Sequence, residues 1–321
     1  MSIECQGVSK RFGSTQALEG ISLTLESGHI YGLLGNNGAG KSTLLSILTD
    51  RQLPDQGTVT IDGAPIRNND RALEKVFLVG EQNLFPEDMK VRRAFQIMTY
   101  FYPTFDVAYA LDLSRQFGLS LKKKIVNLST GYASIFRLIL GLSVNTPYLI
   151  FDEPVLGLDA QHRDLFYRLL IEKFMETSCT VVISTHLIAE VENLIDHTII
   201  LREGRILRDA PTEELVSGAC TISGPAGLVE AYLAGREILT SHALGGLKSV
   251  TFQGALTDPL PVGLEQGAGQ PPGLLHQPAG GGGSERKRKG GRTPCVLNQR
   301  CATSCGSIWW LAAFLGGSAL S

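Results

Sequence analysis

The chain has 321 residues, of which 43% are hydrophobic and 19% are charged, a balance typical of a globular protein with a mixed helix and strand core. The formal net charge of -2 argues against a protein that is drawn to nucleic acid or acidic membranes by its overall charge. The cysteines show no metal-ligand spacing in the first 250 residues, which predicts a reducing, cytosolic environment.

No targeting or membrane-spanning segment is predicted. The start, Met1–Glu4, lacks a charged region followed by an apolar core, so we expect no signal peptide. The longest apolar run, near Ile308–Leu320, is shorter than the roughly 20 residues that a spanning helix needs. If the protein acts at a membrane, we expect another chain to cross it.

Residues 2–34 are predicted to form antiparallel strands. Ile21–Leu25 alternates apolar and polar side chains, as a half-buried strand does. Phe12 lies beside Gly13 in a turn-like setting where an aromatic ring can stack on a base, although an ordinary packed phenylalanine is the better interpretation from the residues alone.

The strongest motif follows the apolar run His29–Leu34, a predicted buried strand, and precedes Leu44–Leu48, which has helical spacing. The pattern G-x-x-x-x-G-K-[ST] in this context predicts a phosphate-binding loop rather than a chance Gly-rich turn. Its glycines let backbone N–H groups wrap phosphates, and the next helix points its positive end at them. Lys41 adds a charge for the β- and γ-phosphates, and Ser42 offers its hydroxyl to Mg²⁺. The loop residues predicted to bind the nucleotide are Gly35, Asn36, Asn37, Gly38, Ala39, Gly40, Lys41, Ser42 and Thr43.

Two more strands are predicted downstream. Gly57–Gly63 ends in an Asp-Gly turn, and Val76–Val79 reads as a buried strand that runs into Gln82. A glutamine just past a strand end, downstream of a phosphate loop, is able to reach the metal or the attacking water. The alternative is a solvated loop glutamine.

The character changes over residues 84–127, where aromatic and charged residues recur at helical spacing and predict a helical insert. The lysines at 122–124 are interpreted as a solvated face. Ser129 then lies where a helix cap belongs, ahead of a helical apolar stripe that begins at Ile135. The free N–H groups of that helix start predict a second place that holds an anion.

Two carboxylates end the next predicted strand. Pro147–Phe151 is apolar and delivers Asp152 and Glu153 at the carboxyl edge, where open α/β sheets bind ligands. Asp152 is suited to the Mg²⁺ shell, and Glu153 to orienting or deprotonating a water. The alternative, an acidic turn after a strand, is weak beside the phosphate loop.

A further strand, Cys179–Ser184, ends at His186, after a helix that is predicted to run from Asp159 to about Met175. A lone histidine is usually structural. This one again ends a strand at the presumed sheet edge, which favours a contact with the γ-phosphate.

Together, the order and spacing of these motifs resemble the ATP-binding cassette, the ATPase subunit of ABC transporters, across about residues 2–217. The resemblance implies an α/β P-loop NTPase with a mixed sheet core, an antiparallel β-subdomain and a helical subdomain at about 84–144. The likeness is strongest to bacterial drug- and bacitracin-efflux subunits, whose membrane domain is a separate polypeptide.

The resemblance also implies roles for particular residues. Gly35–Thr43 matches the Walker A loop and Leu128–Tyr132 the signature, while Leu149–Asp152 matches Walker B. The residues implied in catalysis are Lys41, Gln82, Glu153 as the base and His186 as the switch histidine. Those implied in holding the metal are Ser42, Gln82 and Asp152, and those implied in nucleotide binding beyond the loop are Phe12 on adenine, Gln82, Ser129, Gly131, Asp152, Asp159 of the D-loop and His186.

One departure concerns the signature. The family pattern is LSGGQ, and here Thr130 and Tyr132 replace Gly and Gln, while Ser129 and Gly131, which touch the γ-phosphate across a dimer, remain. The family's sandwich of two cassettes around two ATP molecules is therefore still expected, and the rate of turnover is in doubt.

The implied cofactors are ATP and Mg²⁺, and the implied partners are a separate transmembrane permease subunit and a second cassette, in a homodimer or heterodimer, with no nucleic acid. The implied place is the cytoplasmic face of the cell membrane, with residues 82–105 as the contact surface. A soluble ATPase of ribosomes or DNA is disfavoured, because only one cassette is present and no sustained heptads separate Lys41 from Leu128. A weakly catalytic nucleotide-binding module is the remaining alternative, although Lys41, Glu153 and His186 are intact.

The rest of the chain is predicted to change in composition. Residues 218–257 read as a small accessory α+β region, and residues 258–321 as a low-complexity tail with a Gly run and the basic stretch Arg286–Lys289. The alternatives for the tail are a flexible linker, a membrane-touching segment at Ile308–Leu315 or a translation-frame artefact; plain disorder or the artefact is favoured.

Overall fold

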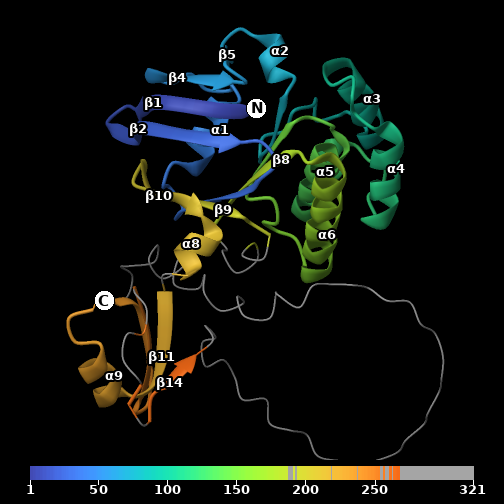
Figure 1. Cartoon of the computed structure of the whole chain (residues 1–321). Helices are drawn as coiled ribbons and strands as arrows, with labels where there is room; N and C mark the ends of the chain where they lie inside the picture. Colours follow the sequence, from blue (N-terminus) through green and yellow to red (C-terminus); the bar gives the residue numbers. More distant parts are fainter. Residues whose placement is uncertain are drawn as a thin grey trace, which may run out of the picture. The chain divides into compact units, whose positions relative to one another are not determined.

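The computed structural model describes residues 1–186, 191, 194–217, 219–236, 238–253, 256, 260–261 and 263–267 (Figure 1). The chain forms two compact units, the first being Met1–Glu214 and the second beginning at Leu215. Among the helices of the described residues, none has the length and the apolar composition that crossing a membrane requires.

An antiparallel sheet opens the first unit, in the order β2-β1-β4-β5. Its strands are β1 (Ser2–Phe12), β2 (Thr15–Glu26), β4 (Gln56–Ile61) and β5 (Ala64–Pro65). The alternation predicted near Leu23 is confirmed, because every second side chain of this part of β2 is buried and the others are exposed. The buried face belongs to the main core cluster of the first unit.

A second, six-stranded sheet has the order β10-β9-β3-β8-β7-β6, in which only β10 runs antiparallel to its neighbour. Its strands are β3 (Ile30–Leu34), β6 (Val76–Val79), β7 (Tyr148–Asp152), β8 (Thr180–Thr185), β9 (His197–Arg202) and β10 (Arg205–Pro211). Strands β3, β6 and β8 are buried throughout, as their continuous apolar runs predicted. The parallel strands bring the ends of β3, β6, β7 and β8 to one sheet edge.

Helix α1 (Lys41–Leu48) follows β3 directly and contributes Leu44, Leu45 and Leu48 to the same core cluster as the antiparallel sheet and the inner strands. A single turn, α2 (Asp70–Leu73), precedes β6. The strand, loop and helix order predicted around the phosphate-binding motif is therefore present in the structure.

The helical insert is present as α3 (Val91–Phe101), α4 (Val107–Gln116), the short 3-10 helix η1 (Ile125–Asn127) and α5 (Thr130–Ser143), and α6 (Ala160–Thr177) follows β7. In Figure 1, α3 and α4 stand beside the sheets, with α5 and α6 next to them. Helix α5 lies close on the sheet at Gly141, where a Cβ atom would meet Val79 at 2.5 Å and Phe151 at 2.9 Å.

The second unit is a small α+β fold. Its antiparallel sheet has the order β12-β13-β11-β14, and its core contains Ile222, Val250 and Phe252 with the helix residue Val229. The elements are β11 (Ala219–Pro225), α9 (Ala226–Tyr232), β12 (Ile238–Leu244), β13 (Leu247–Gln253) and β14 (Glu265–Gly267), preceded by α8 (Thr212–Ser217).

This unit extends further than expected from the sequence, where the tail was placed from about residue 258. Strand β14 pairs with β11, and Leu264 just before it is buried in the core of the unit. The apolar side chain of Leu264 anchors a short strand that has no periodicity of its own. The remainder of the predicted tail, including Arg286–Lys289 and Ile308–Leu315, lies outside the described residues.

Candidate functional site

The loop between β3 and α1 has the geometry of a cradle. Gly40 caps α1 with a φ of +105°, and no side chain among the described residues caps the N-terminus of this helix. A Cβ atom at Gly40 would meet the carbonyl oxygen of Ala17 at 2.6 Å, and one at Gly35 would meet that of Leu201 at 2.5 Å. Glycine is therefore required at both positions, and the N–H groups at the helix start remain available for an anion.

Lys41 is the first residue of α1 and is only 5% exposed. Its Nζ donates hydrogen bonds to the carbonyl oxygens of Gly35 at 2.7 Å and Asn36 at 3.3 Å. The same Nζ lies 3.4 Å from Oε1 of Glu153, on a different strand end. The ammonium group of the loop therefore lies next to the carboxylates that follow β7.

Asp152 and Glu153 differ in environment. Oδ1 of Asp152 accepts a hydrogen bond from the hydroxyl of Ser184 on β8 at 2.8 Å. Glu153 has a φ of +47°, an uncommon backbone conformation for a non-glycine residue, and its N–H donates to the carbonyl oxygen of Ser184 at 2.9 Å. Strained backbone conformations of this kind cluster at functional positions.

The two oxygens of the Glu153 carboxylate have different partners. Oε2 lies 2.9 Å from Nδ1 of His186. Oε1 is buried and, within the described part of the chain, has no hydrogen-bond donor, with Lys41 as its ion-pair partner. A buried acceptor without a hydrogen-bond donor lowers the stability of the fold. A water molecule is able to supply the missing donor to Oε1.

A cleft of about 680 Å³ joins these parts. The predicted site residues that line it are Phe12, Asn37, Gly38, Gly40, Lys41, Ser42, Thr43, Gln82, Asp152, Glu153 and His186. Of the other loop residues, Gly35 and Asn36 hold Lys41 through their carbonyl groups, and Ala39 is buried.

Phe12 is 46% exposed in this cleft, with the ammonium of Lys10 5.7 Å from its ring centroid. The interpretation of Phe12 as an ordinary packed residue is therefore wrong. It ends β1 at the turn to β2, where the described residues cover only part of the ring.

Several lining residues escaped the sequence reasoning. They are Thr15, Gln16, Ala17, Ser46, Arg51, Leu78, Gly80, Glu81 and Leu156. Thr15–Ala17 begin the strand that follows the turn at Phe12. A hairpin at this turn places them beside Phe12, and this could have been predicted from the sequence. For Arg51, whose guanidinium donates to the carbonyl oxygen of Leu78 at 2.8 Å, the sequence carries no signal.

Three predicted site residues outside the phosphate-binding loop do not line the cleft either. Ser129 caps α5, and its Oγ accepts from the N–H of Tyr132 at 3.4 Å; Gly131 lies in the first turn of the same helix. Asp159 caps α6 by accepting from the N–H of His162 at 2.9 Å. This backbone hydrogen bond and the contact with the His162 ring hold the pKa of Asp159 below its usual value. In a single chain these residues therefore belong to a separate surface.

The cleft is suited to a magnesium nucleotide. The Ser42 hydroxyl, the Asp152 carboxylate and the Gln82 amide all line it, and these are the oxygen donors that Mg²⁺ prefers. The glycine cradle and Lys41 provide for phosphates, and the exposed Phe12 ring provides a stacking face for a base. The residues present thus fit both groups.

The comparisons agree with this geometry. The family profile described as ABC transporter matches residues 18–156. The chain is 30% identical over 213 residues to the ABC transporter ATP-binding protein YtrB of Bacillus subtilis, an alignment that covers 66% of this chain and 73% of that protein. It is 32% identical over 220 residues to the Nod factor export ATP-binding protein I of Burkholderia lata, covering 67% of this chain and 72% of that one.

Solved structures share the fold. The ATP-binding subunit of an ABC transporter superposes with a TM-score of 0.62 at 22% identity, over 68% of this chain and 92% of that one. A dimeric post-hydrolysis state of an ATP-binding cassette with bound ADP and Pi superposes with a TM-score of 0.59 at 23% identity, over 65% and 98%. The predicted cassette fold, the ATPase class and the cofactors ATP and Mg²⁺ are confirmed. The chain belongs to the ABC transporter family, as an ATP-binding subunit.

Proposed function

We propose that this subunit hydrolyses ATP to power export by a separate membrane-spanning subunit, with a drug or an antimicrobial peptide as the cargo. The likeness of its motifs to efflux-type subunits supports export. Relatives named for import, such as the ribose import ATP-binding protein RbsA of Pseudomonas putida, are also similar at 30% identity. Export, as opposed to import, is therefore part of what we propose.

The observation that carries the catalytic part of the proposal is the position of Glu153. Its Oε2 lies on the His186 ring, its Oε1 faces Lys41, and both neighbours line the same cleft as Ser42 and Asp152. In this arrangement Glu153 accepts the proton of the attacking water. His186 orients that carboxylate, and Lys41 holds the phosphate oxygens. Ser42, Gln82 and Asp152 would hold Mg²⁺, which would supply positive charge to the phosphates.

A second cassette completes the site in this proposal. Ser129 and Gly131 lie outside the chain's own cleft, at the exposed start of α5, where N–H groups favour an anion. They are suited to the γ-phosphate of an ATP held by a partner cassette. Asp159, exposed at the start of α6, is assigned to the same dimer surface.

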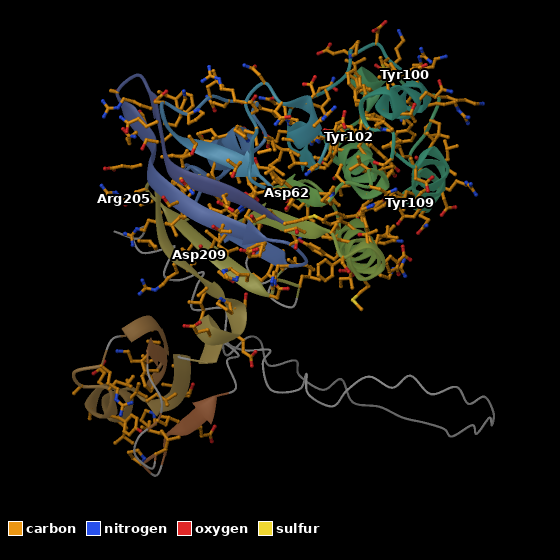
Figure 2. All side chains as sticks on the ribbon, turned by 45° about the horizontal axis from the view of Figure 1, so that its top comes forward. Asp62, Tyr100, Tyr102, Tyr109, Arg205 and Asp209 are labelled. Carbon is orange, nitrogen blue, oxygen red and sulfur yellow. The ribbon has the colours of Figure 1, made fainter. Side chains whose placement is uncertain are left out.

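The membrane partner is assigned to a groove on the helical side. A cavity of about 160 Å³ is lined by the loop after β6, by η1 and by α5, and Leu84 and Val126 on its wall are 46% and 54% exposed. Tyr100 and Phe101 at the end of α3 are 77% and 67% exposed, and Figure 2 labels Tyr100 on the helical side of the first unit. Such apolar groups favour contact with a protein segment. The exposed residues Leu84, Tyr100 and Phe101 lie within the expected residues 82–105, and the cavity extends beyond that range to β6, η1 and α5.

The test is the substitution Glu153→Gln in the full chain. We expect turnover to fall by roughly a hundredfold to ten-thousandfold, the usual contribution of a general base, while ATP remains bound. Size-exclusion chromatography with MgATP is then expected to show a trapped dimer. The exposed Glu172→Gln is the control, since Glu172 lies on α6 and does not line the cleft. Hydrolysis at the wild-type rate in Glu153→Gln would remove Glu153 as the base.

A further inference from the structure

Arg137 lies on α5, outside the nucleotide cleft, and yet it connects two of the loops that form the cleft. One guanidinium nitrogen donates to the carbonyl oxygen of Glu81 at 2.6 Å, and the other donates to Oγ of Ser134 at 3.0 Å. The Ser134 hydroxyl in turn donates to the carbonyl oxygen of Leu156 at 3.3 Å. These three hydrogen bonds run from the loop after β6, across α5, to the loop after β7.

Both ends of this chain of hydrogen bonds lie next to residues of the proposed mechanism. Glu81 directly precedes Gln82, and Leu156 is tied to Glu153 by a hydrogen bond from its N–H to the Glu153 carbonyl oxygen at 3.3 Å. Glu81 and Leu156 both line the nucleotide cleft. They also line an adjoining cavity of about 330 Å³, together with Ser134 and Arg137.

The two hydrogen bonds of Ser134 are partly buried, whereas the bond from Arg137 to the Glu81 carbonyl oxygen is exposed. Ser134 is 6% exposed, and burial lowers the pKa of the Arg137 guanidinium, which nevertheless stays charged because its ordinary value is so high. A charged donor makes a stronger hydrogen bond to a carbonyl than a neutral one. Helix α5 packs closely on β6 and β7 at Gly141. A movement of α5 would therefore also move the loops that Arg137 and Ser134 contact.

We infer that Arg137 and Ser134 are positioning residues, which tie the placement of Gln82 and of the Glu153 loop to the placement of α5. The first turn of α5 carries Ser129 and Gly131. The docking of that turn on a partner's γ-phosphate is thereby linked to the geometry of the chain's own cleft. This inference rests on the proposed roles of Gln82 and Glu153.

The first experiment compares Arg137→Met, Arg137→Lys and Ser134→Ala with the wild type in the full chain. The phosphate loop is untouched, so we expect the affinity for MgATP and KM to stay within about twofold. The kcat of Arg137→Met is expected to fall by roughly tenfold to a hundredfold, the scale of a small misplacement of reacting groups. Arg137→Lys keeps a charged donor and is expected to recover part of kcat, and Ser134→Ala to show a smaller loss.

Arg115→Met is the matched control, because Arg115 is a 76% exposed arginine that forms an ion pair with Asp112 on the same helix. Thermal melting of each variant separates a loss of fold from a loss of positioning. A wild-type kcat in both Arg137→Met and Ser134→Ala, or an equal rise in KM and fall in kcat/KM at constant kcat, would overturn the inference.

The second experiment places Arg137→Met in a Gln82→Ala background. If Arg137 acts through Gln82, its substitution is expected to cost much less there than in the wild type, because interacting residues are not additive. A full and equal loss in both backgrounds contradicts the inference for Gln82. If Gln82→Ala lowers kcat while Arg137→Met does not, only the inference fails. If Gln82→Ala itself leaves kcat unchanged, the proposed role of Gln82 fails with it.

Discussion

The ammonium of Lys41 lies 3.4 Å from the Glu153 carboxylate, so the cation of the phosphate loop and the proposed base form an ion pair. The two side chains are 6% and 17% exposed. Removing one partner of a pair this buried lowers the stability of the fold, because the other charge is then buried without a counter-charge. We therefore expect binding of the γ-phosphate to exchange one anionic partner of Lys41 for another and to leave Glu153 to the water and to His186.

Substitution Lys41→Met tests this exchange. We expect ATP affinity to fall at least about tenfold, since a charged contact to the phosphates is lost. We also expect the nucleotide-free chain to be destabilised by about 1–3 kcal/mol, because Glu153 Oε1 is then a buried acceptor without a partner. Thermal melting with and without MgATP measures both effects.

In that assay ATP is expected to raise the melting temperature of the wild type and to have little effect on Lys41→Met, since only binding to the folded state stabilises it. Lys122→Met, at an exposed position, serves as the control. An ATP-induced shift of wild-type size in Lys41→Met would show that the loop lysine does not contact the nucleotide.

Substitution Ser129→Arg tests the separation between the chain's own cleft and its signature surface. ATP binding by the isolated chain is expected to stay within about twofold, while a bulky side chain at the dimer surface lowers hydrolysis by about a hundredfold. Loss of the cap on α5 adds about 1 kcal/mol of destabilisation. Equilibrium nucleotide binding, ATPase rate and analytical ultracentrifugation with MgATP are the measurements, with Ser120→Arg at an exposed position as control. An unchanged turnover rate would place the dimer contact elsewhere.

Substitution Gly141→Ala tests the seating of α5. Alanine favours helices by about 1 kcal/mol over glycine. Here, however, its methyl group would meet Val79 and the Phe151 ring below 3 Å. Overpacking of this kind costs about 1–3 kcal/mol, so we expect a net loss of stability, measured by urea unfolding. Gly227→Ala in α9 is the control, since no atom of the described residues lies within 4 Å of the added Cβ and no loss is expected. A more stable Gly141→Ala would show that α5 is loosely packed.

The acid response of the first unit is expected to depend on Asp62, which Figure 2 labels. Burial by itself raises its pKa, but hydrogen bonds from Lys75 Nζ at 2.6 Å, Tyr148 Oη at 2.9 Å and the N–H of Ser2 outweigh it, so the pKa lies below the ordinary value of 3.8. The depressed pKa contributes stability that is fully present above pH 3.8 and is lost as the pH falls through the lower, folded value.

Substitution Asp62→Asn isolates this charge, because asparagine tolerates the φ of +52° at this position. We expect a loss of about 1–2 kcal/mol at pH 7 and a smaller decline in unfolding free energy than in the wild type as the pH falls below 3.8. Urea unfolding as a function of pH provides the comparison. Parallel curves for the two proteins would show that Asp62 does not carry the pH dependence.

Much of the cassette was predictable from local sequence. The glycines at 35 and 40 are dictated by backbone contacts that any side chain would obstruct, and the short apolar runs before Gly35, Gln82 and Asp152 are typical of strands covered on both faces. Because parallel strands end at one edge, the polar residues after them had to converge. The order of strands and motifs along the sequence was therefore enough to predict that these polar residues lie together.

Other features depended on packing between distant segments. The exposure of Phe12, the hydrogen bond from Arg137 to the Glu81 carbonyl and the open Oε1 of Glu153 have no pattern in the sequence. Each depends on where a neighbouring element ends or how closely it lies, as α5 does at Gly141. Periodicity reports which face of an element is buried, and only the tertiary structure decides which side chains and carbonyl groups meet across elements.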